Sequence, residues 1–290
     1  MRAILSSKVK IKLSLPDANY GHLKPQEDSF MIKDNIFCVA DGITRDPISP
    51  IDFDKLSMEE LLKNYPSSSG AKMAADCFCK SFIDYIKSHT TSNQMSVKAF
   101  KFANTKIEKL NRKCNPHIDY LVNDFYACVA CGGVIDKSIL YWSSIGDAEI
   151  KIFDQNGNLK FGSPNGVTSF LNYAKTNPQD WGKPERRREV RSQFRNNPNK
   201  SINGQLVAYG ALTGEKNAEY FIKSGEVDLS KGDLITFYTD GFAQTIKNKQ
   251  FIELVYKNNL SELLALDKIL SKQNYRKYGK ERTLVAILSD

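Results

Sequence analysis

Acidic residues stand beside three strand-like hydrophobic stretches that are far apart in the sequence. They are Glu27 and Asp28 in KPQEDSFMI, Asp41 in NIFCVADGI and Asp240 in DLITFYTDGF, and a glycine follows both Asp41 and Asp240. Carboxylates gathered at one edge of a buried sheet repel one another, which disfavours their ionised forms. Divalent cations such as Mg²⁺ and Mn²⁺ neutralise such charge and prefer oxygen ligands. The pattern therefore predicts carboxylates collected around metal ions.

Asp41 is the strongest single candidate, because it ends the apolar run IFCVA and is followed by Gly42. A glycine allows the backbone to approach closely, so a carboxylate and a main-chain carbonyl can be presented to the same ion. An isolated Asp-Gly turn after a strand would look the same, and the repetition at Asp240 favours the site. Neighbouring strand residues face opposite ways, so Glu27 and Asp28 are expected to have different roles.

The elements that would position these residues follow from hydrophobic periodicity. Strand patterns in VKIKLSL, FMI and IFCVA precede two amphipathic helices, the first of them offered N-caps by Ser67–Ser69. Strands return in FYACVACGGVI, ILYWSSIG and AEIKIFD, then in EYFIKSG and DLITFYTD, before two more helices and a last strand, TLVAIL. This order predicts an α+β protein with two antiparallel sheets flanked by helices.

The length of 290 residues favours a single domain over 1–290, with an irregular insertion at about 162–204. Basic residues are concentrated in this insertion, between Lys183 and Lys200, and we interpret it as a mobile flap whose positive charge attracts negatively charged substrates. The net charge of +8 is too small to identify nucleic acid as a ligand.

The motifs GxxKPQEDSF, FCVADG, SSIGDAEI, FYTDGF and ERTLVAIL occur in an order that resembles the metal-dependent protein phosphatases of the type 2C serine/threonine class. The resemblance spans nearly the whole chain. It implies a four-layer αββα sandwich and two divalent ions, Mn²⁺ or Mg²⁺. It also implies a phosphomonoesterase that removes phosphate from phosphoserine and phosphothreonine in proteins by attack of a metal-bridging hydroxide.

The resemblance also implies a role for each site residue. Asp41 would bridge the two ions, the Gly42 carbonyl would bind one of them, and Asp240 would be a direct ligand. Glu27 and Asp28 would act in catalysis mainly through metal-bound waters. Asp147, in SSIGDAEI, matches an aspartate that helps to bind a third ion, although a structural turn explains it equally well.

Two positions depart from the family pattern. Lys280 stands where the last metal-binding aspartate is expected, and Gln244 replaces a second aspartate of the third-ion site. We expect Glu281, the nearest carboxylate, to replace the missing ligand. The family places a basic residue near its Glu-Asp pair to bind phosphate, and Lys24 and Arg45 are the candidates for this role.

The departures keep a second hypothesis open, a catalytically weak or inactive phosphatase-like regulatory module. A third, nucleic-acid binding through 183–200, is disfavoured because Phe194 and the nearby Trp181 are the only aromatic residues available for stacking. The six cysteines lie mostly in apolar patterns, which favours reduced thiols over disulfides. With no signal-peptide pattern, we expect a cytoplasmic monomer in signalling, with phosphoproteins as partners and without membrane or nucleic-acid partners.

Overall fold

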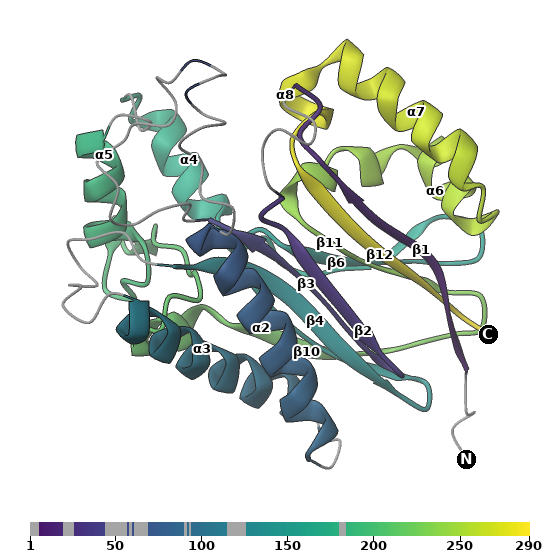
Figure 1. Ribbon diagram of the computed structural model, residues 1–290, viewed down its shortest axis with the longest axis horizontal. Coiled ribbons are helices and arrows are strands. Elements are labelled where there is room, and N and C mark those ends of the chain that lie inside the picture. Colours follow the sequence, from purple (N-terminus) through teal and green to yellow (C-terminus); the bar gives the residue numbers. More distant parts are fainter. Residues whose placement is uncertain are drawn as a thin grey trace.

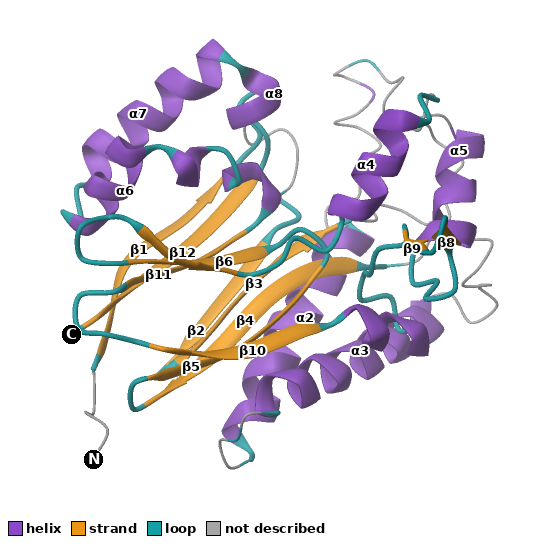
Figure 2. Ribbon diagram, turned by 180° about the vertical axis from the view of Figure 1, so that it is seen from behind, coloured by secondary structure: helices purple, strands orange, loops and turns teal. Residues whose placement is uncertain are grey.

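A computed structural model of the chain describes residues 6–19, 26–43, 57, 60, 69–89, 92, 94–114, 126–179 and 184–290. Two five-stranded sheets lie face to face (Figures 1 and 2). The first sheet has the order β1 (Ser7–Leu15), β12 (Arg282–Ser289), β11 (Leu234–Tyr238), β6 (Glu149–Phe153), β7 (Leu159–Gly162). The second has the order β10 (Lys223–Asp228), β5 (Ile139–Ile145), β4 (Cys128–Asp136), β3 (Ile36–Gly42), β2 (Ser29–Lys33). Every neighbouring pair in both sheets is antiparallel.

Helices cover the outer face of each sheet, which confirms the expected αββα sandwich. The second sheet carries α2 (Gly70–Lys87) and α3 (Met95–Cys114), and the first carries α6 (Lys249–Tyr256), α7 (Leu260–Gln273) and α8 (Tyr275–Tyr278) (Figure 1). The serine-rich N-cap of α2 is also confirmed, because the Ser69 side chain accepts a hydrogen bond from the Lys72 amide.

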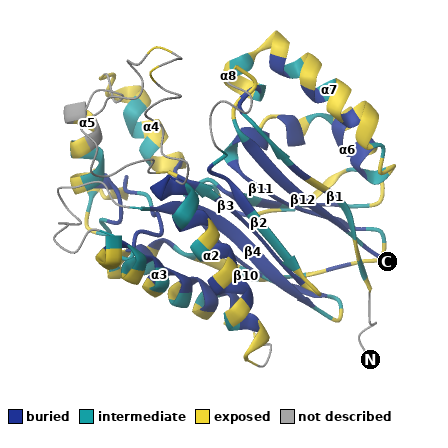
Figure 3. Cartoon of the chain, viewed as in Figure 1, coloured by how far each residue is buried: buried dark blue, intermediate teal, exposed yellow. Residues whose placement is uncertain are grey.

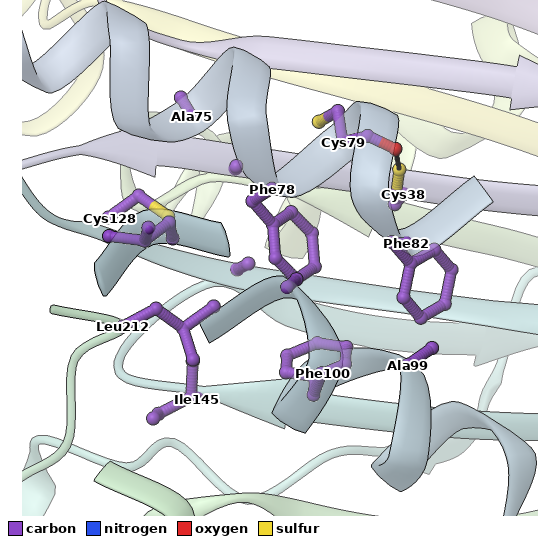
Figure 4. Packing of buried hydrophobic residues seen from close by; sticks show 14 of the residues in the cluster. Cys38, Ala75, Phe78, Cys79, Phe82, Ala99, Phe100, Cys128, Ile145 and Leu212 are labelled. Atoms are coloured by element: carbon purple, nitrogen blue, oxygen red, sulfur yellow. Dashed lines mark hydrogen bonds between the residues drawn. The ribbon is translucent and has the colours of Figure 1, made fainter. Parts of the chain in front are cut away.

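Three clusters of buried hydrophobic residues hold the sandwich together. One lies between the second sheet and its helices α2 and α3, one between the two sheets, and one between the first sheet and its helices (Figure 3). In the first cluster, Phe100 of α3 packs edge-on against Phe78 and Phe82 of α2 (Figure 4). In the cluster between the sheets, Phe37 of β3 stacks on Phe237 of β11 with 6.0 Å between ring centroids. This contact fixes the spacing of the two strands that lead to Asp41 and Asp240.

The chain between β7 and β10 is built from short elements beside one end of the sandwich (Figure 1). They are α4 (Thr168–Thr176), α5 (Pro184–Glu189), a π-helical turn (Val190–Phe194), β8 (Ser201–Ile202), β9 (Gln205–Leu206) and a 3-10 helix (Lys216–Phe221). The strand predicted for EYFIKSG is wrong in its first half, which belongs to this 3-10 helix. Ala218 and Phe221 are buried three residues apart, which is the period of a 3-10 helix and not of a strand. The division into one domain with an insertion stays a prediction.

All six cysteines are free, as predicted, and Cys38, Cys79, Cys128 and Cys131 are buried. Burial raises the pKa of the Cys79, Cys128 and Cys131 thiols, so these side chains are poor sources of thiolate. None of the described helices is long and apolar enough to cross a membrane.

Candidate functional site

The strand registers bring the predicted acidic residues to one end of the sandwich. Ser29 pairs with Ala40, so Asp28 and Asp41 flank the same end of β2 and β3. In the other sheet Tyr238 pairs with both Leu284 and Glu149, so the residues after β11, before β12 and before β6 meet at one edge. Those residues include Asp240, Glu281 and Asp147. Antiparallel pairing thus unites carboxylates that are up to 254 positions apart in the sequence.

Asp41 lies at the electrostatic centre of this group. Burial is the main cause that raises its pKa well above the usual aspartate range, and the negative charges of Asp28, Asp240, Asp147 and Glu281 raise it further, in that order. Like charges disfavour ionisation when water cannot screen them. The arrangement therefore holds excess negative charge that a cation would relieve.

Asp28 is buried and joins the two sheets. Its Oδ2 accepts a hydrogen bond of 2.7 Å from the Thr239 hydroxyl, and the Thr239 Oγ1 in turn accepts one of 2.8 Å from the Thr283 amide. Burial, and next the charge of Glu281, raise the pKa of Asp28 well above its usual range, while the hydrogen bonds from Thr239 and Thr283 oppose this. Asp28 therefore fixes the distance between the sheets at the site.

Glu281 ties the segment before β2 to the start of β12. Its Oε1 accepts hydrogen bonds from the backbone amides of Glu27 and Asp28, the second at 2.7 Å. This carboxylate therefore lies at the same edge, but one of its oxygens is already used to position the chain, and its role as a metal ligand stays a prediction. Glu27 is also buried, and it contributes its backbone amide to this contact.

Lys280 lies against Asp240, with 3.5 Å between its Nζ and the aspartate Oδ2. The Lys280 side chain is 57% exposed and that of Asp240 is 33% exposed. Burial raises the pKa of Asp147 to about 7, and the charge of Asp240 contributes further to this rise. The positive charge of Lys280 opposes part of it. An ammonium therefore interacts with two of the predicted ligands.

Two glycines allow backbone segments to pack closely around the site. A Cβ on Gly42 would lie 2.5 Å from the backbone of Ala71, so α2 reaches the end of β3 only because position 42 has no side chain. A Cβ on Gly241 would lie 2.2 Å from the Glu281 carbonyl oxygen. The turn that carries Asp240 thus packs directly on the segment that carries Lys280.

Sequence reasoning missed Thr239 and Lys72. Thr239 precedes Asp240 directly and could have been found from that position, whereas no sequence signal marks Lys72. Its Nζ lies 2.8 Å from the Asp28 carbonyl oxygen, 2.6 Å from the Ser29 hydroxyl and 3.1 Å from Asp76. The phosphate-binding candidates Lys24 and Arg45 lie outside the described residues, so their role stays a prediction.

The carboxylates differ in what already lies beside them, which bears on how a metal ion could be held. Within the described ranges, no three His, Cys, Asp or Glu side chains are arranged so that they could hold one ion. Mg²⁺ commonly keeps several waters and uses only one or two carboxylates, so an ion of that kind does not need three such side chains. At Asp240 the Lys280 ammonium already lies beside the carboxylate.

The comparisons with known proteins support the fold. No protein-family model and no curated protein matches the sequence. The solved structures that match include the catalytic domain of the serine/threonine protein phosphatase PstP with two manganese ions, at a TM-score of 0.58 and 12% identity, covering 99% of this chain and 98% of that one.

Two further structures give the same result. PppA, a regulatory component of the type VI secretion system in Pseudomonas aeruginosa, matches at a TM-score of 0.58 with 9% identity over 99% of each chain. The PPM serine/threonine phosphatase MsPP from Mycobacterium smegmatis matches at 0.55 with 11% identity, covering 99% of this chain and 98% of that one. The chain therefore has the fold of the metal-dependent, type 2C serine/threonine protein phosphatases.

Proposed function

We propose that this protein is a divalent-metal-dependent phosphomonoesterase that acts on phosphoserine and phosphothreonine in proteins. The observation that supports it most directly is that the strand registers bring Asp28, Asp41, Asp147, Asp240 and Glu281 to one end of the sandwich, where the other carboxylates raise the pKa of Asp41. Burying mutually repelling carboxylates at the end of two sheets is unfavourable for folding alone, and a cation is what relieves it. The same fold in PstP carries two manganese ions.

In this proposal, Asp41 and the Gly42 carbonyl would hold a divalent ion. A bound divalent ion supplies positive charge for the phosphate oxygens and lowers the pKa of water toward neutrality. Thr239 keeps Asp28 in place through its hydrogen bond, and Glu281 keeps the Glu27–Asp28 backbone beside β12. These contacts maintain the spacing of the carboxylates while a substrate enters and leaves.

Cysteine-based phosphate chemistry is disfavoured by the thiols themselves. Cys128 pairs across the sheet with Gly42, yet burial raises the pKa of its thiol, and the nearby charge of Asp41 is among the smaller causes that raise it further. A thiol of raised pKa is a poor nucleophile near neutral pH. The sequence also lacks the CxxxxxR loop of cysteine phosphatases.

The test is hydrolysis of an aryl phosphate and of a phosphothreonine peptide with EDTA, Mg²⁺ or Mn²⁺. Asp41→Asn and Asp240→Asn are each expected to lower turnover by more than about tenfold, or roughly 1.4 kcal/mol of transition-state stabilisation. Asp34→Asn is the matched control, because Asp34 lies in the exposed β2–β3 turn with a positive φ that asparagine also adopts. Near-normal turnover in both site variants would contradict the proposal.

The same assay separates the alternative, a phosphatase-like regulatory binding module. The Lys280–Asp240 pair favours this alternative, because it places a cation beside a predicted ligand. A module of this kind would bind phosphopeptide without hydrolysing it under any of the metal conditions. Hydrolysis that EDTA abolishes and Mn²⁺ restores would exclude it.

A further inference from the structure

Lys280 combines a fixed backbone with a side chain that reaches the carboxylate cluster. The Arg282 guanidinium donates a hydrogen bond of 2.5 Å to the Lys280 carbonyl, and Arg282 itself is held by Asp267 and Ser271 of α7. On the preceding side, the Gly279 carbonyl accepts a hydrogen bond of 2.7 Å from the Ala18 amide. The backbone of the lysine is therefore held by β12, by α7 acting through Arg282, and by the segment that follows β1, and its position does not depend on its own ion pair.

The Lys280 side chain extends toward the carboxylates at the end of the sandwich. Its Nζ lies 3.5 Å from the Asp240 Oδ2 in the 3-10 turn after β11. Its charge also reaches Asp147, in the turn between β5 and β6. Lys280 thus lies beside a carboxylate at the acidic edge, the place where a cation would otherwise be needed.

From this geometry we infer that the Lys280 ammonium takes the place of one of the two divalent ions, so that the site binds a single ion on the Asp41 side. The inference rests on the proposed function only in treating the site as one that binds a divalent ion. A second ion at Asp240 would have to displace the ammonium or lie beside it, and like charges at such separations repel strongly when the site is partly buried.

Glu281 does not restore the second ion in this arrangement. Its Oε1 already accepts the backbone amides of Glu27 and Asp28. Moving Oε1 to an ion at Asp240 would break those hydrogen bonds and leave two amide donors at a buried segment, which is unfavourable. The charge balance at Asp240 therefore depends on Lys280.

The test counts ions on the full chain after EDTA treatment. The protein is titrated with Mn²⁺ and measured by native mass spectrometry, by calorimetry and by electron paramagnetic resonance, in which an isolated Mn²⁺ and an adjacent pair have different spectra. The wild type is expected to bind one ion. Lys280→Asp is expected to bind two, the second at least about tenfold more tightly than any second ion in the wild type, or roughly 1.4 kcal/mol.

Two variants control for charge and for side-chain size. Lys280→Arg keeps the positive charge and is expected to bind one ion. Lys277→Asp makes the same charge change on an exposed lysine of α8 and is also expected to bind one ion. Two ions in the wild type, or a single ion in a folded Lys280→Asp, would overturn the inference. If Lys280→Asp does not fold, the wild-type count and its spectrum decide the question alone.

Hydrolysis of aryl phosphate by the same samples separates this inference from the proposed function. One bound ion without hydrolysis supports the role of Lys280 and contradicts the enzyme proposal. Two bound ions with hydrolysis would support the enzyme proposal and contradict the role of Lys280. A wild type that binds no ion and hydrolyses nothing would overturn both.

Discussion

Two ion pairs that begin only two residues apart differ in almost every physical property. Arg282 and Asp267 are 2.5 Å apart, with side chains only 3% and 7% exposed, and the arginine makes two parallel hydrogen bonds to the carboxylate. Lys280 and Asp240 are 3.5 Å apart, with side chains 57% and 33% exposed. The first pair joins α7 to β12, and the second joins the start of β12 to the turn after β11.

The difference separates an ion pair that stabilises the fold from one that balances charge at the candidate site. A buried bidentate pair cannot lose one partner without leaving an uncompensated charge, so it fixes the backbone around it. A half-exposed pair is screened by water, so it contributes little to the free energy of folding while its charge still lies beside the carboxylate. The structure thus places a rigid pair directly behind a solvent-screened one.

Breaking the buried pair is expected to have the largest effect. Arg282→Met leaves Asp267 buried without its partner and removes the donor to the Lys280 carbonyl, at a cost of about 3–5 kcal/mol in the free energy of unfolding. Urea unfolding in EDTA measures it. The double variant Arg282→Met/Asp267→Leu is the control and should recover much of the loss. A loss below about 1 kcal/mol for the single variant would mean that the pair does not anchor α7.

The metal-free protein is expected to lose stability as the pH rises. Burial raises the pKa of Asp147 from 3.8 to about 7, and the pKa values of Asp28 and Asp41 are also raised. Between pH 4 and 7 the folded state therefore binds more protons than the unfolded state, so the free energy of unfolding falls over this range. Each unit of pKa shift corresponds to about 1.36 kcal/mol.

Melting in EDTA between pH 5 and 8 checks this expectation. The Tm should fall with rising pH, by roughly 2–4 °C for each kcal/mol. Asp147→Asn should flatten part of the slope, and saturating Mn²⁺ should remove most of it by neutralising the cluster. Asp34→Asn serves again as the control and should keep the wild-type slope. A Tm that rises with pH in EDTA would show that the cluster is not repulsive.

Breaking the exposed pair is expected to have the smallest effect on folding. In EDTA, Lys280→Gln should change the free energy of unfolding by less than about 1 kcal/mol, because both side chains are partly exposed and the pair is screened by solvent. The change should shrink further in high salt. Lys277→Gln provides the reference. A loss as large as that of Arg282→Met would place Lys280 with the structural pair and remove the contrast between the two.

Most of the architecture could be predicted from local patterns. The apolar runs that became β3, β11 and β12 are buried throughout most of their length, and the Asn156-Gly157 turn joins β6 to β7 with Gly157 at a φ of 77°. These signals are strong because each depends on a few adjacent residues. The 3-10 helix at Lys216–Phe221 was misassigned because its aromatic residues resemble a strand until the burial of Ala218 and Phe221 is known.

The site was predictable in its members but not in its contacts. Asp28, Asp41, Asp147, Asp240 and Glu281 could be named from sequence, and the strand registers bring them to one edge. Sequence could not show that Glu281 accepts the amides of residues 27 and 28, since that contact spans 253 positions or more. Likewise the anomaly at Lys280 was visible, but its approach to Asp240 depends on Gly241 and on the anchoring of Arg282.

The place of β12 in the first sheet has a consequence for biosynthesis. This strand, Arg282–Ser289, lies between β1 and β11 and pairs with both. On the ribosome, β1 must therefore wait for almost the whole chain before its neighbour exists, and pairings of such long sequence separation are slow to form. The second sheet with α2 and α3 can assemble earlier, because its strands end at Asp228. The acidic edge is thus completed last, because Asp240 and Glu281 follow the last strand of the second sheet in the sequence.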